Sequence, residues 1–160
     1  MKKDEEKAIN DFRVVVDNRE QLPFKFSNIM YTTLPYGDYT IEYAGKIYID
    51  KIVIERKGNV SELFAFSGSN RERFCRELEK MKNEKYKYLL FEFDFMDIVN
   101  KQPYGKLPAS TVFATLFSFM IKYQITPLFC GNRTNARNTL YKLFQFFVKY
   151  EILGLHKNDT

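Results

Sequence analysis

Histidine and cysteine are scarce in this 160-residue chain, which has one histidine, His156, and two cysteines, Cys75 and Cys130. The cysteines form no C-x-x-C pair, which excludes the common zinc ribbons and thioredoxin-type redox pairs. One histidine near the end of the sequence argues against Ser-His-Asp, Cys-His and H-E-x-x-H chemistry. If the protein is an enzyme, its carboxylates and lysines must therefore carry the reaction.

Long apolar runs are also lacking. No window reaches the roughly 18 apolar residues that a membrane span needs, and the first residues, MKKDEEKAIND, are charged rather than signal-like. We therefore expect an intracellular protein with no membrane association. Its richness in Lys, Asn, Phe and Tyr suits a low-GC bacterium or a bacterial virus, so the expected location is the cytoplasm of a bacterium or of a phage-infected host.

The basic excess lies entirely in the second part of the chain. The protein has 25 Lys and Arg against 20 Asp and Glu, a net charge of +5. Residues 1–100 contain 17 basic and 18 acidic side chains, whereas residues 101–160 contain 8 and 2. One interpretation is a surface that binds a polyanion, and the other is a surplus that serves only solubility.

Alternating strand and helix patterns predict one α/β domain with helices on both faces of a mixed sheet. Residues 1–11 are expected to be a charged, flexible N-terminus, residues 12–150 the domain and residues 151–160 a tail. The expected elements follow the order β-ββ-αα-β-α-β-α. Strands are expected over 12–17, 38–43, 47–54, 86–93 and 126–130, and helices over 60–66, 70–83, 110–123 and 134–150.

Three acidic residues stand where an expected strand begins or ends, namely Asp17, Asp38 and Glu55. Alternation along the third strand sends Glu55 and Lys57 to one face and Arg56 to the other. A carboxylate and an ammonium group then meet beside an acid of the neighbouring strand. Such a set can bind a hard cation such as Mg²⁺, which prefers one or two carboxylates plus water and phosphate oxygens.

Phosphodiester hydrolysis is the chemistry that uses such a set. A cation held by Asp38 and Glu55 would lower the pKa of a bound water, and Lys57 would orient the nucleophile or neutralise charge on the phosphate. Taken singly, however, each acid is more often an ordinary turn or strand-end residue.

The combination of three motifs resembles a known family. V-D-N-R-E (16–20), L-P-Y-G-D-Y (34–39) and I-E-R-K (54–57) precede an Arg-containing helix. They look like the nuclease domain of the XPF-type structure-selective endonucleases, which include archaeal Hef and belong to the PD-(D/E)xK superfamily. The resemblance covers roughly residues 12–150 and implies a single restriction-endonuclease-like α/β domain with a central mixed sheet flanked by helices.

The resemblance also implies roles for individual residues and a Mg²⁺ cofactor for which Mn²⁺ substitutes. The implied metal ligands are Asp17, Asp38 and Glu55, the implied catalytic residues are Asp38, Glu55, Lys57 and Arg56, and the implied site-ordering residues are Arg19 and Glu20.

Two departures from the family pattern bear on this expectation. The final acid of the motif would fall at Ser61, which is followed by Glu62. A serine there can cap the next helix as an aspartate would. It lacks a carboxylate, however, so a weaker or altered metal site is one expected result of the change. We also expect no helix-hairpin-helix domain, in which case contact with DNA would come from the nuclease domain, a dimer or another chain.

Five basic residues are the candidates for contact with DNA phosphates. Three of them lie on the helix after the E-R-K motif, and two lie in the basic second part of the chain. Contacts of this kind give affinity without sequence reading. The alternative for each residue is an ordinary solvated cation. The candidates are Arg71, Arg73, Arg76, Lys106 and Arg133.

The two C-terminal helices are too apolar for a single core-facing stripe, which indicates full burial or a shared interface. Because the resembled family dimerises through its nuclease domain, we expect a homodimer, or a heterodimer, through these helices. A helicase or another DNA-processing protein is the further expected partner.

The function expected from these observations is a metal-dependent endonuclease that cuts branched, flapped or single-strand-containing DNA in repair, recombination or replication. Two alternatives remain. One is an inactive DNA-binding or partner subunit of an XPF-type complex, and the other is an α/β interaction module.

Overall fold

Seven strands form one mixed sheet in the computed structural model, which describes residues 2–100 and 107–156. Six of them follow the order β2-β1-β3-β5-β6-β7, and β4 pairs with β3. The pairs β1/β2, β5/β6 and β6/β7 are parallel, whereas β3 runs antiparallel to β1, β4 and β5. The strands are β1 (Phe12–Asp17), β2 (Ile29–Thr32), β3 (Tyr39–Tyr43), β4 (Lys46–Ile47), β5 (Ile52–Lys57), β6 (Tyr86–Phe91) and β7 (Thr126–Phe129).

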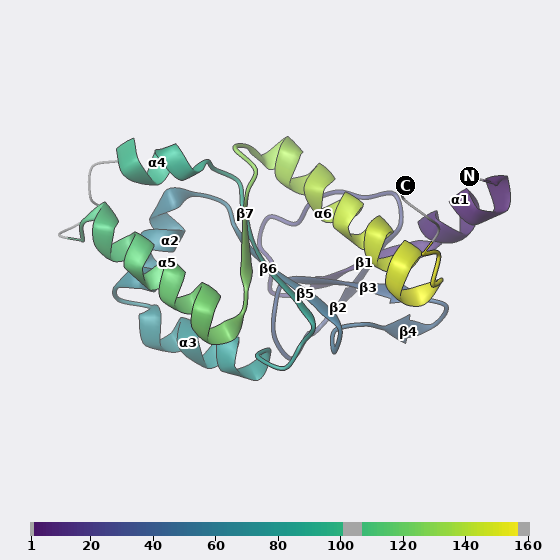
Figure 1. The fold of residues 1–160 in the computed structure, drawn as a ribbon, viewed down its shortest axis with the longest axis horizontal. Helices are drawn as coiled ribbons and strands as arrows, with labels where there is room; N and C mark the ends of the chain where they lie inside the picture. The colour runs from purple at the N-terminus through teal and green to yellow at the C-terminus, as the bar shows by residue number, and fades with distance from the viewer. Residues whose placement is uncertain (1, 101–106, 157–160) are drawn as a thin grey trace.

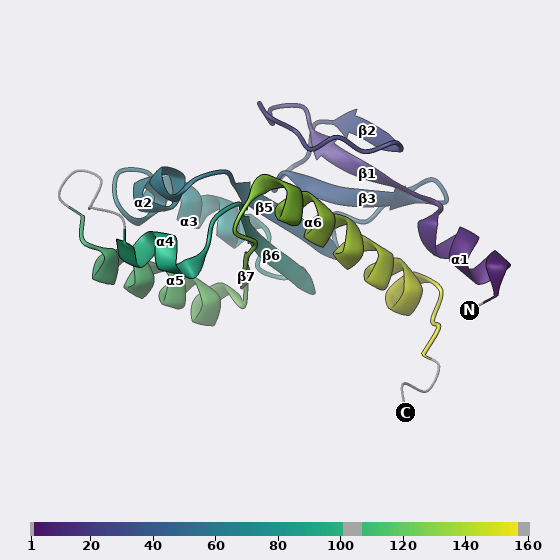
Figure 2. The ribbon, with the colours of Figure 1, turned by 90° about the horizontal axis from the view of Figure 1, so that it is seen from above.

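Helices cover both faces of the sheet. In both views α2 to α5 form one group, while α6 lies apart from them and runs beside the sheet toward α1 (Figures 1 and 2). The helices are α1 (Lys3–Asn10), α2 (Val60–Ser67), α3 (Arg71–Lys80), α4 (Phe95–Asn100), α5 (Ala109–Tyr123), α6 (Arg133–Phe147) and the π-helical turn η1 (Val148–Ile152). Among the described residues, no helix combines the length and apolarity needed to cross a lipid bilayer.

Each face of the sheet has its own hydrophobic core. On one face, Val53 and Leu89 pack with the apolar sides of α2, α3, α4 and α5. On the other face, Ile54 and Leu90 pack with the buried side of α6. Because neighbours in a strand point to opposite faces, a central strand such as β5 needs apolar residues at successive positions. The uninterrupted run Ile52–Ile54 follows from this requirement.

The structure confirms the predicted α/β fold with a central mixed sheet flanked by helices, but it adds elements that the sequence patterns did not reveal. Strand β2 and helix α4 occupy segments for which no strand or helix was expected. The expected strand 47–54 is divided into β4 and β5 by a turn at residues 49–51. Residues 3–10, part of the expected charged and flexible N-terminus, form the helix α1, in which Ile9 is buried.

The turn before β3 depends on a glycine. Gly37 has φ +74°, and a Cβ built there would lie 2.2 Å from Cγ2 of Val53. An alanine would therefore meet both backbone strain and a packed neighbour. Gly45, in the β3–β4 turn, has φ +86° but no heavy atom within 4 Å of a built Cβ.

We expect Gly37→Ala to lower the free energy of unfolding by about 2–4 kcal/mol, because strain and overpacking act together. Gly45→Ala is the matched control and should cost about 1 kcal/mol, because it meets strain alone. Equilibrium urea denaturation measures both variants. Equal losses would contradict the contact with Val53.

Candidate functional site

The three strand-end acids lie side by side across β1, β3 and the end of β5. The N–H of Asp17 donates to the carbonyl of Asp38 at 2.9 Å, and the N–H of Asp38 donates to the carbonyl of Ile54 at 2.9 Å. Tyr39 pairs with Ile54, so Asp38 lies next to Glu55. The side chains of these acids point to the face that α2 and α3 cover.

Asp38 and Glu55 form a hydrogen-bonded pair of carboxyl groups. Burial, and then the charge of Asp38, raise the pKa of Glu55 to about 8. Burial also raises the pKa of Asp38, against the charge of Lys57 and an N–H bond from Arg56. Because two adjacent carboxylates repel, Glu55 keeps its proton and donates a hydrogen bond to Asp38. Glu55 is buried, whereas Asp38 keeps part of its surface open to solvent.

Lys57 completes this group. Its Nζ lies 3.5 Å from Oε2 of Glu55. The same ammonium stands 3.9 Å from the ring centre of Phe66 and 5.3 Å from that of Phe74. The two rings pack together with centroids 4.2 Å apart. A desolvated cation over aromatic faces is stabilised electrostatically, so α2 and α3 hold the lysine beside the acid pair.

Asp17 is oriented differently from the other two acids. Its carboxylate accepts hydrogen bonds from Nε of Arg19 at 2.8 Å and from the N–H of Leu34 at 2.8 Å. Burial acts to raise the pKa of Asp17, but these hydrogen bonds outweigh it and hold the pKa below its usual value. Within residues 2–100 and 107–156, no three His, Cys, Asp or Glu side chains are gathered so as to hold a metal ion. Asp38 and Glu55 are paired with each other whereas Asp17 bonds Arg19, and the metal-ligand roles predicted for all three stay predictions.

Arg56 connects the acid pair to the opposite face of the sheet. Its N–H donates to Oδ2 of Asp38 at 2.8 Å. Its guanidinium group lies 3.1 Å from Oε1 of Glu20 and 2.6 Å from Oε2 of Glu92. Burial and the charge of Asp38 raise the pKa of Glu20. Arg56, expected to be catalytic, and Glu20, expected to order the site, therefore belong to one charge network beneath the acid pair, and both roles stay predictions.

The first turn of α2 carries the departure from the family motif. Asn59, rather than Ser61, caps the helix, because its side chain accepts the N–H of Glu62. Oε2 of Glu62 in turn accepts the N–H of Gly58 at 2.8 Å. The arrangement differs from a capping box in that Glu62 bonds the residue before the N-cap, so Glu62 stabilises the end of β5 as well as the start of α2.

The structure divides the predicted DNA contacts into two groups. On α3, Arg71, Arg73 and Arg76 are exposed, although Arg76 pairs with Glu72. Arg133 instead makes ion-pair and carbonyl contacts within the protein. The other predicted contact, Lys106, lies outside the described residues.

Two contributors to the site were missed from the sequence. Glu92 comes directly after β6, the same strand-end placement that drew attention to Glu55, and this signal could have found it. Phe66 lies in a helical apolar pattern that looks like any core position. No local sequence signal distinguishes a ring under a lysine from a ring in a core.

With this geometry established, comparisons with known proteins are informative. A family model described as the ERCC4 domain matches residues 9–143. The chain belongs to the ERCC4 domain family. The predicted resemblance to the XPF-type family is thereby confirmed. No curated protein sequence matches the chain.

Two solved structures are similar to this ERCC4 domain. XPF from Aeropyrum pernix is 20% identical with a TM-score of 0.63, and the match covers 84% of this chain and 60% of that one. XPF from the same organism in complex with DNA is 17% identical with a TM-score of 0.55, over 87% and 66% of the two chains. This ERCC4 domain shares the fold of both and spans less than two thirds of their lengths.

The acid pair makes the stability of the metal-free protein depend on pH. Because the pKa of Glu55 is raised from its ordinary 4.5 to about 8, the folded state retains a proton that the unfolded state has lost. The free energy of unfolding therefore falls as pH rises through this window. Glu55→Gln keeps a hydrogen-bond donor toward Asp38 but has no group that titrates there. Its free energy of unfolding, relative to that of wild type, should therefore rise by about 1–3 kcal/mol between pH 5 and pH 8.

Urea denaturation in the presence of a chelator measures this gain. Glu42→Gln is the control, because the hydrogen bond from Arg13 lowers the pKa of Glu42. The difference in free energy of unfolding between Glu42→Gln and wild type should not change between pH 6 and pH 8. A pH-independent difference for Glu55→Gln as well would show that Glu55 is already ionised.

Proposed function

We propose that this ERCC4 domain is a divalent-metal-dependent DNA endonuclease that hydrolyses phosphodiester bonds. The observation that carries the proposal is the pair formed by the buried Glu55 and the partly buried Asp38, with the ammonium group of Lys57 3.5 Å from Glu55. Burying two adjacent carboxyl groups is costly for a structural role alone, and strongly perturbed acids cluster at functional sites.

The donor set fits a hard cation. Asp38 and Glu55 offer oxygen ligands, and their mutual repulsion would be relieved when a divalent ion replaces the shared proton. Two carboxylates plus water and substrate oxygens suit Mg²⁺, with Mn²⁺ as a substitute. A bound divalent ion would supply Lewis-acid polarisation of the phosphate and a more acidic water. We keep Asp17 as a neighbouring residue that orders the site rather than as a ligand.

The protein's own residues would then position the substrate. Lys57, held over Phe66, can donate to a phosphate oxygen or to the attacking water and can neutralise charge that develops on the phosphate. The exposed arginines of α3, the helix that also carries Phe74, offer phosphate contacts. DNA bound to the similar XPF structure supports DNA as the substrate class here. Branched, flapped or single-strand-containing DNA and a role in repair, recombination or replication follow from the family resemblance.

An inactive DNA-binding or partner subunit is the second candidate, because Ser61 replaces the last acid of the family motif. The structure provides a specific reason to place it second. Glu62, next to Ser61, already bonds the end of β5 through Gly58, so the replacement leaves Asp38, Glu55 and Lys57 together.

We expect wild-type protein with Mn²⁺ to cut flap or fork DNA. Asp38→Asn, Glu55→Gln and Lys57→Met should each lower the cleavage rate by about 10²–10³, because each removes a charge that acts on the phosphate or the ion. Gel analysis of end-labelled flap, fork and linear DNA measures the rates.

Glu42→Gln is the matched control for these variants. Glu42 lies on the same face of β3 as Asp38 but pairs with Arg13, so cleavage should be unchanged. Binding of DNA without cleavage by wild type would favour the inactive subunit. Neither binding nor cleavage would favour an interaction module.

We also propose that the expected dimer forms through exposed apolar side chains of α5 and α6. Part of the apolar surplus predicted for these helices is covered, since Val148 is buried and Tyr141 packs against Phe12. The large apolar residues that remain exposed on these two helices are Phe117, Ile121 and Phe146.

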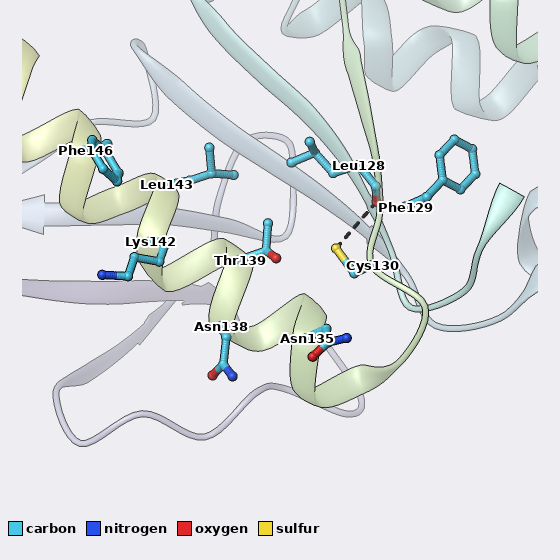
Figure 3. A pocket seen from close by; sticks show the side chains of 9 residues that line it. All are labelled: Leu128, Phe129, Cys130, Asn135, Asn138, Thr139, Lys142, Leu143 and Phe146. Carbon is cyan, nitrogen blue, oxygen red and sulfur yellow. Dashed lines mark hydrogen bonds between the residues drawn. The ribbon is translucent and has the colours of Figure 1, made fainter. Parts of the chain in front are cut away.

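A groove lies beside this surface, between β7 and α6 (Figure 3). Leu128, Leu143 and Phe146 line it, so apolar surface continues from α6 to the last strand of the sheet. An exposed apolar surface of this kind suits a second copy of the chain or a related chain. On the basis of the family resemblance we also propose a helicase or another DNA-processing protein as a partner.

Light scattering coupled to size exclusion, at micromolar concentration, tests the dimer. Ile121→Glu should convert the protein to a monomer, because Ile121 is 83% exposed and a charge there would be buried in the interface. Tyr31→Glu is the control, because Tyr31 is 54% exposed on β2, at the opposite edge of the sheet from β7. A strictly monomeric wild type would contradict the proposal.

A further inference from the structure

Four charged side chains form a continuous network on the face of the sheet opposite the acid pair. Arg56 lies between Glu20 at 3.1 Å and Glu92 at 2.6 Å. Glu92 also pairs with Arg133 at 3.3 Å. The side chains of Arg56 and Glu92 are only 8% and 5% exposed. Two positive and two negative groups balance, which is the condition under which buried charges are tolerated.

Arg133 makes several contacts within the protein, although its side chain is 46% exposed. Its Nη2 donates to the carbonyls of Leu22 at 2.9 Å and Pro23 at 3.0 Å. Its guanidinium group lies 4.8 Å from the ring centre of Phe24, and that of Arg56 lies 5.2 Å from the same ring. As the first residue of α6, Arg133 opposes the helix dipole, so helix stability does not explain its position.

The network contacts the site through the main chain of β5. The N–H of Glu92 donates to the carbonyl of Lys57 at 3.0 Å. A Cβ built on Gly58 would lie 3.0 Å from Oε2 of Glu92 and 3.2 Å from Nη2 of Arg56, so the end of β5 packs directly on this ion pair. The N–H of Arg56 fixes Asp38 from the same stretch of backbone. The position of the network therefore determines where Asp38 and Lys57 stand.

We propose that Glu92 and Arg133 are positioning residues of the nuclease site, which act through Arg56 on the carboxylate of Asp38 and the main chain at Lys57. The inference rests on the proposed function. It assigns to Arg133 an internal role in place of the DNA contact predicted from the sequence. It also means that α6, on the opposite face of the sheet from Lys57, helps to determine the geometry of the site.

The test compares Glu92→Gln, which keeps the shape and removes the charge, with Arg133→Ala and Arg133→Lys. Removal of supporting partners around a metal site typically lowers activity or metal affinity about 10–100-fold. We expect Glu92→Gln and Arg133→Ala to lower kcat for cleavage by about that factor. The Kd for DNA should stay within about twofold of wild type, because neither side chain contacts phosphate. Arg133→Lys keeps the charge toward Glu92 and should recover part of the rate.

Arg137→Ala is the matched control on the same helix. Arg137 also holds the loop after β1, through the carbonyl of Lys25 at 2.8 Å and the ring of Phe26 at 4.6 Å, but it makes no contact with Glu92. Its loss should leave kcat unchanged. An equal loss of kcat in this variant would overturn the inference, because loop anchoring alone would then explain the effect.

A second readout separates this inference from the proposed function. Calorimetric titration of metal-free protein with Mn²⁺, without DNA, should show affinity about tenfold weaker in Glu92→Gln and Arg133→Ala than in wild type or Arg137→Ala. If wild type does not cleave DNA, the proposed function fails, and weakened Mn²⁺ binding in the two variants would still support the positioning role.

Three further outcomes overturn the inference. One is unchanged kcat and Mn²⁺ affinity in both variants. Another is a raised Kd for DNA in Arg133→Ala with unchanged kcat, which would make Arg133 a DNA contact. The third is a wild type that neither cleaves DNA nor binds Mn²⁺, which would remove both proposals.

Discussion

The repulsion between two buried carboxyl groups is the constraint on which the rest of the site depends. Asp38 and Glu55 lie on adjacent strands and share a hydrogen bond, and burial and mutual charge raise the pKa of Glu55 to about 8. A protein of marginal stability keeps such a pair only if nearby groups compensate. Lys57, the N–H of Arg56 and a proton on Glu55 do so here.

The alternation of β5 distributes these compensating groups over two faces of one strand. Glu55 and Lys57 meet the aromatic rings of α2 and α3 on one side, while Arg56 enters a closed charge network on the other. The strand is thereby anchored from both sides at the point where its acid must hold position. This explains why a motif of three consecutive charged residues can lie at the buried end of a central strand.

Much of the fold and of the acid pair could be predicted from the sequence because both depend on short-range patterns. Apolar runs predict β1, β5 and β6, and the position of Asp38 and Glu55 at the ends of expected strands identified them as candidates. The failures involve long-range contacts. Strand β2 is a half-buried four-residue edge strand with no strong pattern of its own. The hydrogen bond from Arg19 to the Asp17 carboxylate could not be predicted either, because alternation along a strand does not determine which neighbour a side chain meets.

Arg133 illustrates the same limit and has a consequence for electrostatics. Basic residues in the second part of the chain were expected to attract DNA, yet Arg133 and Arg137 bond to carbonyl oxygens of the loop after β1. Both guanidinium groups therefore join α6 to a loop more than 100 residues earlier in the sequence, and fewer of their N–H donors remain for contact with phosphate. An interface that relies on fewer phosphate contacts releases fewer counterions, so its affinity for a polyanion depends less steeply on ionic strength.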